Sequence, residues 1–87
     1  MIELITIKQT KEELGKWCKV QRDRFGLTQQ ELADKLGISR YTIQKIENGK
    51  NSTIDTILKI AHHFDDLSKF YSGLKSYNDQ NTTSSLY

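Results

Sequence analysis

The chain has 87 residues, of which 36% are hydrophobic and 28% charged, and this length allows one small domain with a thin core that dimerisation often stabilises. Its formal net charge of +2 gives only modest attraction to a polyanion, so a surface for nucleic acid requires local clustering of cations. A single cysteine excludes an internal disulfide and a cysteine-based zinc site, and the absence of a long apolar run or a signal-like start predicts a cytoplasmic protein.

Residues 1–9 form an N-terminal arm with the composition of a strand. Ile2, Ile5, Thr6 and Ile7 are β-branched, and an extended strand here would carry apolar side chains on both of its faces. A lone strand cannot satisfy the hydrogen bonds of its edges. We therefore consider three arrangements: pairing with the same strand of a second subunit, pairing with the C-terminal tail, or a frayed tail that lies over the core.

A long helix is predicted over residues 11–25. Thr10 and Glu13 have the spacing of a capping box, which satisfies two backbone N–H groups at a helix start. Cys18 is predicted to be a small apolar side chain on the inner face, and Gln21 interrupts the apolar stripe as a partly exposed edge.

Two short helices follow, at residues 29–36 and 40–47, separated by a bend at residues 37–39. Thr28 and Glu31 form another capping box, and Gly37 can take the left-handed conformation that ends a helix. Ser39 then supplies a new N-cap only two residues later, so the second helix must restart at a steep angle. Such a pair, with a polar outer face on the second helix, is the arrangement of major-groove readers.

The sequence of the second half of the chain predicts a turn and two more helices, at residues 53–63 and 66–76. Residues 48–51 form the turn, and Ser52 or Thr53 caps the fourth helix. His62 and His63 point about 100° apart on a helix, so with Asp65 and Asp66 they read as a solvated helix end and not as a metal site. The fifth helix carries an apolar stripe that could form part of a dimer face, namely Leu67, Phe70, Tyr71 and Leu74. Residues 77–87 are polar and predicted to be disordered.

The motifs between residues 12 and 64 resemble the Cro/C1-type (XRE) helix-turn-helix family at the expected spacings. The matching motifs are Leu27-Thr28-Gln29, Glu31-Leu32-Ala33, Leu36-Gly37-Ile38-Ser39, Thr42-Ile43 and Ile46-Glu47-Asn48-Gly49-Lys50. The resemblance implies an all-α, five-helix, lambda-repressor-like domain over residues 10–76. It also implies a buried ion pair between Arg22 and Glu47, which would hold the second helix of the motif to the first helix of the chain.

The clustering of charge and polar groups predicts which residues meet DNA. Four cations and one acid occur between Lys35 and Lys50. Side chains at the start and on the outer face of helix 40–47 are predicted to contact bases: Ser39, Arg40, Tyr41, Gln44 and Lys45. Residues at the start of helix 29–36 and in the turn after helix 40–47 are predicted to contact phosphates: Thr28, Gln29, Gln30, Asn48, Lys50, Asn51 and Ser52.

These features predict a transcriptional regulator, acting as a repressor, that binds double-stranded DNA as a homodimer on an inverted repeat. The sequence also allows two alternatives: an antitoxin that binds a toxin as well as its own operator, and a protein-interaction module on the same fold. No constellation of catalytic groups, phosphate-cradling glycine loop or set of metal ligands is present, so we expect neither an enzyme nor a cofactor.

Overall fold

The computed structural model describes residues 4–82, and within that range it contains five helices and no strand. The helices are α1 (Ile7–Arg24), α2 (Gln29–Leu36), α3 (Arg40–Glu47), α4 (Ile54–His63) and α5 (Leu67–Thr82). The expected all-α fold is therefore confirmed. None of the described helices is long and apolar enough to cross a membrane.

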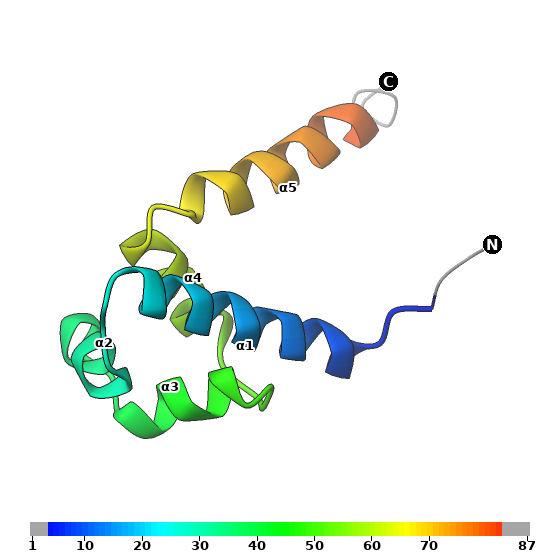
Figure 1. Cartoon of the computed structure of the whole chain (residues 1–87). Coiled ribbons are helices and arrows are strands. Elements are labelled where there is room, and N and C mark those ends of the chain that lie inside the picture. Colours follow the sequence, from blue (N-terminus) through cyan, green and yellow to red (C-terminus); the bar gives the residue numbers. More distant parts are fainter. Residues whose placement is uncertain (1–3, 83–87) are drawn as a thin grey trace.

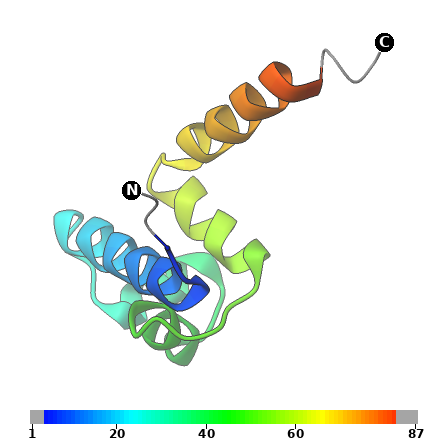
Figure 2. The ribbon, with the colours of Figure 1, turned by 90° about the vertical axis from the view of Figure 1, so that its right-hand side faces the viewer.

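Helices α1 to α4 form the body of the molecule, and α5 projects from it (Figures 1 and 2). The radius of gyration is 15.4 Å, whereas a compact chain of this size would have about 12 Å. The projection of α5 explains the difference, because none of the residues of α5 is buried.

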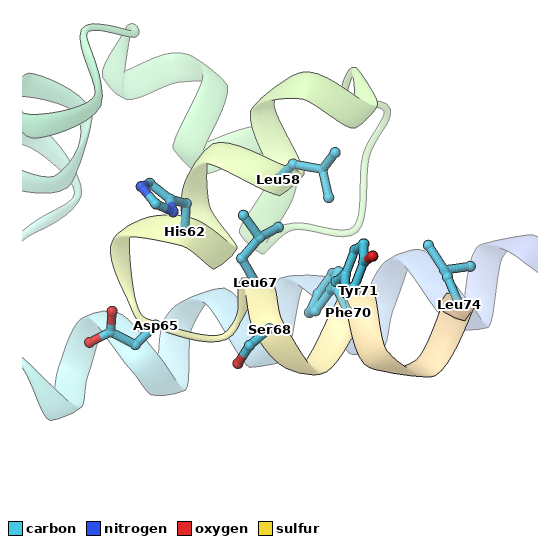
Figure 3. Close-up of a pocket in the computed structure, with 8 residues that line it drawn as sticks. All are labelled: Leu58, His62, Asp65, Leu67, Ser68, Phe70, Tyr71 and Leu74. Atoms are coloured by element: carbon cyan, nitrogen blue, oxygen red, sulfur yellow. The ribbon is translucent and has the colours of Figure 1, made fainter. Parts of the chain in front are cut away.

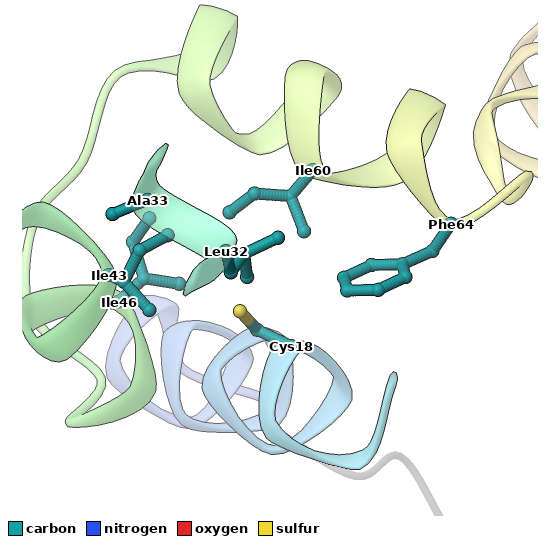
Figure 4. Close-up of a cluster of buried hydrophobic side chains, with 7 residues drawn as sticks. All are labelled: Cys18, Leu32, Ala33, Ile43, Ile46, Ile60 and Phe64. Atoms are coloured by element: carbon teal, nitrogen blue, oxygen red, sulfur yellow. The ribbon is translucent and has the colours of Figure 1, made fainter. Parts of the chain in front are cut away.

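The core lies between α1, α2, α3 and α4, where their apolar stripes meet (Figure 4). Leu32, Ile43 and Ile60 are fully buried, and the Cys18 thiol faces them from α1. The inner-face position expected for Cys18 is therefore correct. Since α3 shares this core with α1 and α2, its orientation is set by packing on two helices at once.

The N-terminal arm departs from the sequence-based expectation. Thr6, not Thr10, is the N-cap of α1, and it forms a capping box with Gln9: the Gln9 N–H donates to Thr6 Oγ1 (3.0 Å) and the Thr6 N–H donates to Gln9 Oε1 (2.8 Å). Ile7 and Lys8 are thus helical, and residues 4–6 form no strand. The expected strand is wrong for the part of the arm from residue 4 onward, and residues 1–3 lie outside the described range.

The C-terminal end also departs from expectation, because α5 continues to Thr82 where a disordered tail from residue 77 was expected. Side chains hold the polar end of the helix: Lys75 pairs with Asp79 at 3.0 Å, and Asn81 donates to the Tyr77 carbonyl at 2.7 Å. Residues 83–87 lie outside the described range.

Candidate nucleic-acid interface

Helices α2 and α3 form the predicted helix-turn-helix. Thr28 accepts from the Glu31 N–H (3.0 Å) and Glu31 reaches back to the Thr28 N–H (2.8 Å), which fixes the start of α2. Gly37 ends α2 in the left-handed region with φ of 68°, and the Ile38 N–H returns to the Ala33 carbonyl at 3.0 Å. The bend is therefore closed by backbone hydrogen bonds.

One face of α3 is buried and the other is polar. Ile43 and Ile46 point into the core, while Arg40, Tyr41 and Gln44 are exposed and Lys45 is half-buried. The Lys45 Nζ lies 5.4 Å from the centre of the Tyr41 ring, so the ammonium sits over the ring in a cation–π contact. Four side chains that can bond to base edges therefore share one surface.

Ser39 lies at the start of this surface, but its hydroxyl is already engaged. Its Oγ accepts from the Thr42 N–H at 3.1 Å and lies 2.9 Å from Thr42 Oγ1. The N-cap role predicted for Ser39 is confirmed, and the exposed hydroxyl retains limited capacity for a further hydrogen bond.

A network centred on Glu47 fixes α3 to the rest of the body. The Glu47 carboxylate accepts from Arg22 Nε (2.8 Å), Arg22 Nη2 (3.1 Å) and Gln29 Nε2 (3.1 Å). Arg22 Nη1 donates to the Leu27 carbonyl at 2.8 Å, which ties in the loop before α2. The side chains of Arg22 and Glu47 are only 12% and 5% exposed, so this is the buried ion pair that the resemblance implied.

Burial of the Glu47 carboxylate acts to raise its pKa, but the hydrogen bonds from Arg22 and Gln29 and the charge of Arg22 outweigh it and hold the pKa below its usual range. Glu47 therefore stays ionised and neutralised by Arg22. The same setting raises the pKa of the Cys18 thiol to about 12, chiefly through burial and then through the nearby Glu47 charge. Because Glu47 is paired with Arg22, its charge does not offset the charges of Arg40 and Lys45 on the same helix.

The residues predicted to contact phosphate lie in two groups. At the start of α2, Gln29 is half-buried and donates to Glu47, while Gln30 is exposed and donates to Asp34 at 2.8 Å. The second group lies after α3, in residues 48–53. Asn48, Lys50, Asn51 and Ser52 are all exposed there.

Backbone hydrogen bonds fold this second group into a turn. The Lys50 N–H bonds to the Lys45 carbonyl at 2.9 Å and the Gly49 N–H to the Ile46 carbonyl at 3.0 Å. Thr53, and not Ser52, caps α4 by accepting from the Thr56 N–H. The turn is therefore a defined structure between α3 and α4.

Two structural features were missed from the sequence, of which the first positions this surface. Gly15 lies where α1 crosses α3, and a Cβ there would stand 2.5 Å from the Ile46 carbonyl oxygen and 2.9 Å from that of Glu47. Only glycine allows the two backbones to approach so closely.

The second is Asp66, for which the sequence predicts a solvated helix end. That reading is wrong for Asp66, which is 7% exposed and whose Oδ2 accepts from Trp17 Nε1 at 2.7 Å and Gln21 Nε2 at 2.5 Å. Gln21 is likewise 8% exposed and not a partly exposed edge. These contacts tie the start of α5 to α1. The described residues hold no group of three potential metal ligands.

Comparison with known proteins agrees with this architecture. A family model described as helix-turn-helix matches residues 19–70, which include α2, α3 and α4. A protein of Methanoculleus marisnigri that carries the provisional name of an HTH-type transcriptional regulatory protein is 41% identical over 50 residues. The match covers 58% of this chain but only 16% of that protein. The chain belongs to the XRE-type helix-turn-helix family, a family of DNA-binding regulatory domains.

Proposed function

We propose that this protein binds double-stranded DNA in a sequence-specific manner and regulates transcription as a repressor. The observation that carries the proposal is the two-sided α3: its apolar side is fixed in the core while Arg40, Tyr41, Gln44 and Lys45 share the solvent side. An α-helix of this kind fits the major groove, where base edges present distinct patterns of donors and acceptors.

The chemistry of the side chains assigns their roles on this surface. Arg40 can donate two hydrogen bonds to O6 and N7 of guanine, and Gln44 can pair with N6 and N7 of adenine. Lys45 can reach a guanine or a phosphate. Tyr41, held under the Lys45 ammonium, can pack its ring on a thymine methyl while its hydroxyl reaches a phosphate. Ser39, at the helix start, could accept or donate one further bond.

The phosphate contacts would come from both flanks of α3. On one flank, Thr28, Gln29 and Gln30 lie at the N-terminus of α2, where backbone N–H groups and the helix dipole favour an anion. The bond from Gln29 to Glu47 uses one of its two amide hydrogens and leaves the other for a phosphate. On the other flank, Asn48, Lys50, Asn51 and Ser52 would contact the backbone of the opposite strand. Such contacts set register and not sequence.

We also propose a two-fold dimer on an inverted repeat, because one eight-residue helix reads too few base pairs to be selective. A groove of about 610 Å³ lies between α4 and α5 and is lined mainly by apolar side chains, namely Leu58, Leu67, Phe70, Tyr71 and Leu74 (Figure 3). Tyr71, Leu74 and Tyr77 of α5 are 63%, 68% and 66% exposed, which is unusual for large apolar side chains. The partner that we assign to this face is a second copy of α5.

The positions of the charged residues on α5 are compatible with pairing between two copies of this helix. At 100° per residue, Lys69, Lys75 and Asp79 lie away from the line through Leu67, Leu74 and Asn81. In an antiparallel pair centred on Leu74, no charge would therefore meet its own copy. The N-terminal arm is less suited to the role, since Ile7 and Lys8 are helical.

An antitoxin is the second candidate. The same apolar groove could hold a toxin instead of a second copy, and the exposed side chains of Leu4, Ile5 and Ile7 offer a separate apolar surface. Purification with the product of a neighbouring gene would support that reading. The third candidate is a protein-interaction module that does not bind DNA. The salt dependence of the affinity for duplex DNA distinguishes it from the other two.

The test of the proposed function is binding to random duplex DNA across a range of salt concentration. Each phosphate contact contributes about −0.9 to the slope of log affinity against log salt, so a surface with several contacts should lose affinity steeply. Replacing Lys45 and Lys50 together by Met should make the slope shallower by about 2. The matched control replaces Lys69 and Lys75 of α5 by Met. This variant loses the same charge, and its slope should equal that of the wild type. No binding at low salt, or equal losses in both double variants, would contradict the proposal.

A further inference from the structure

The first turns of α1 support the loop that follows α3. Gly49 has φ of 73°, and a Cβ at this position would lie 3.1 Å from the Glu12 Cγ, so the loop backbone rests directly on α1. Beside this contact, the Lys11 Nζ donates a hydrogen bond to Asn51 Oδ1, across 40 positions of sequence. Two neighbouring residues of α1 therefore meet two nearby residues of the loop.

Lys11 and Lys50 also line one small hollow, of about 140 Å³, with Ser52 as its third polar residue. Leu14, Ile46 and Ile57 supply the apolar part of its wall. Two ammonium groups from different elements thus flank a site whose described lining contains no carboxylate. Glu12, which contacts Gly49 beside the hollow, is the one acid adjacent to Lys11 on α1, so the two ammonium groups and this carboxylate together have a net charge of +1.

The bond from Lys11 gives the Asn51 amide a direction. A phosphate oxygen accepts hydrogen bonds, so an asparagine assists it only through its NH₂ group. Because Lys11 occupies Oδ1, the Asn51 Nδ2 must point the other way, away from the ammonium. Lys11 has three N–H donors and uses one on Asn51, which leaves two for an anion.

We infer that Lys11 belongs to the DNA-binding surface: it orients Asn51 and, with Asn51 and Lys50, binds one backbone phosphate. The inference rests on the proposed function and adds to it a residue of α1, outside the helix-turn-helix. It also explains why the loop is built against α1, since a phosphate contact from a loose loop would cost conformational entropy on binding.

The test measures the affinity of random duplex DNA for the wild type and for Lys11→Met at about 50 and 200 mM salt. Loss of one phosphate contact should make the slope shallower by about 0.9, so the affinity ratio of wild type to variant should shrink roughly 3.5-fold between the two salts. Lys11→Arg keeps the charge and a donor and should restore the slope. The matched control is Lys16→Met, which removes the same charge about 140° away around the same helix.

The orientation of the Asn51 amide is tested separately, by replacing Asn51 with Ala in the wild type and in Lys11→Met. If Lys11 directs the amide, Asn51→Ala should weaken binding clearly in the wild type and much less in Lys11→Met. Circular dichroism and thermal unfolding of each variant show that the fold is retained. Equal slopes for Lys11→Met and Lys16→Met, or additive effects of Lys11→Met and Asn51→Ala, would overturn the inference while the proposed function stands. A wild type that does not bind duplex DNA would overturn both.

Discussion

Gly15 fixes how closely α3 can approach α1. Since a Cβ would stand 2.5 Å from the Ile46 carbonyl oxygen, Gly15→Ala must push the two helices apart even though alanine favours a helix more than glycine does. We expect the free energy of unfolding to fall by about 1–3 kcal/mol, as for other overpacked sites, when measured by urea denaturation.

Gly73 is the matched control, because it is also helical but a Cβ there would meet nothing within 4 Å. Gly73→Ala should raise the free energy of unfolding by about 0.5–1 kcal/mol through helix propensity alone. Stabilisation of similar size by both substitutions would show that α1 and α3 are not in backbone contact at Gly15.

The buried pair of Arg22 and Glu47 is a second contact on which the placement of α3 depends. Glu47→Gln removes the buried partner of the Arg22 guanidinium and leaves it only the exposed Asp23 carboxylate, 3.6 Å from Arg22 Nη1. We expect a loss of roughly 3–5 kcal/mol in the free energy of unfolding, with reduced DNA affinity. Glu13→Gln, at an exposed pair with Lys16, makes the same chemical change and should leave stability nearly unaltered. A melting temperature and DNA affinity that stay at wild-type values in Glu47→Gln would show that the pair does not hold α3.

At the scale of elements, α5 is attached to the body mainly through its first turns. Asp66 accepts from Trp17 and Gln21 of α1, and the rings of Trp17 and Phe70 are 5.4 Å apart. The hydrogen bond from the Trp17 indole, followed by that from Gln21, lowers the pKa of Asp66 against the opposing effect of burial. The ionised carboxylate is therefore the form that anchors α5.

This anchor predicts a pH dependence. A lowered pKa in the folded state contributes stability that is present above the unfolded value of about 4 and is lost as pH falls through the folded value. Asp66→Asn should thus be less stable than the wild type at pH 7, and the difference should shrink below about pH 4. Fluorescence of Trp17, the only tryptophan, reports the contact directly. Asp65→Asn is the control, since Asp65 is exposed and left-handed (φ of 61°), and a difference for Asp66→Asn that is constant with pH would contradict the anchor.

Both ends of α2 and the start of α3 were predictable from sequence because each carries one strong local signal. Thr28, Gly37 and Ser39 act over three or four residues, and no competing signal lies nearby. The start of α1 was not predictable in this way, since Thr6 and Thr10 are both followed by a residue that completes a capping box. The earlier cap prevails because each residue added to an existing helix gains a backbone hydrogen bond, which outweighs the weak strand preference of Ile7.

The candidate site was predictable only in part, for a different reason. The exposure of Arg40, Tyr41 and Gln44 follows from the period of Ile43 and Ile46 along one helix. Gly15, Asp66 and Lys11 act through partners that are distant in sequence. Ile46 lies 31 positions from Gly15, Trp17 lies 49 positions from Asp66, and Asn51 lies 40 positions from Lys11, and no local pattern encodes such contacts. Contacts of this kind become visible only when the helices are placed against one another.

At the scale of the whole molecule, the projecting α5 predicts self-association. Leu74→Asp would place two like charges at the centre of the pair and should convert a dimer to a monomer in sedimentation equilibrium at micromolar concentration. Ser76→Asp adds the same charge on the opposite side of α5 and should remain dimeric. A wild type that is monomeric both alone and with DNA, or a Leu74→Asp variant that still dimerises, would remove α5 as the dimer face.

The proposed dimer predicts the arrangement of the DNA site. Two copies of α3 about 34 Å apart would enter successive major grooves on one side of B-DNA. The preferred site should therefore be an inverted repeat whose half-sites are one helical turn apart. A single half-site selected as efficiently as a repeat would contradict this arrangement.

The central claim is that the solvent side of α3 reads bases while the adjacent loop holds phosphates, and selection from a randomised duplex library tests it most directly. For Arg40→Ala, we predict a loss of about 1–3 kcal/mol on the wild-type site and relaxed preference at one position of each half-site. For Lys50→Ala, we predict weaker binding with every preference retained. If Arg40→Ala selects the same sequence as the wild type at every position, α3 does not read DNA through this face.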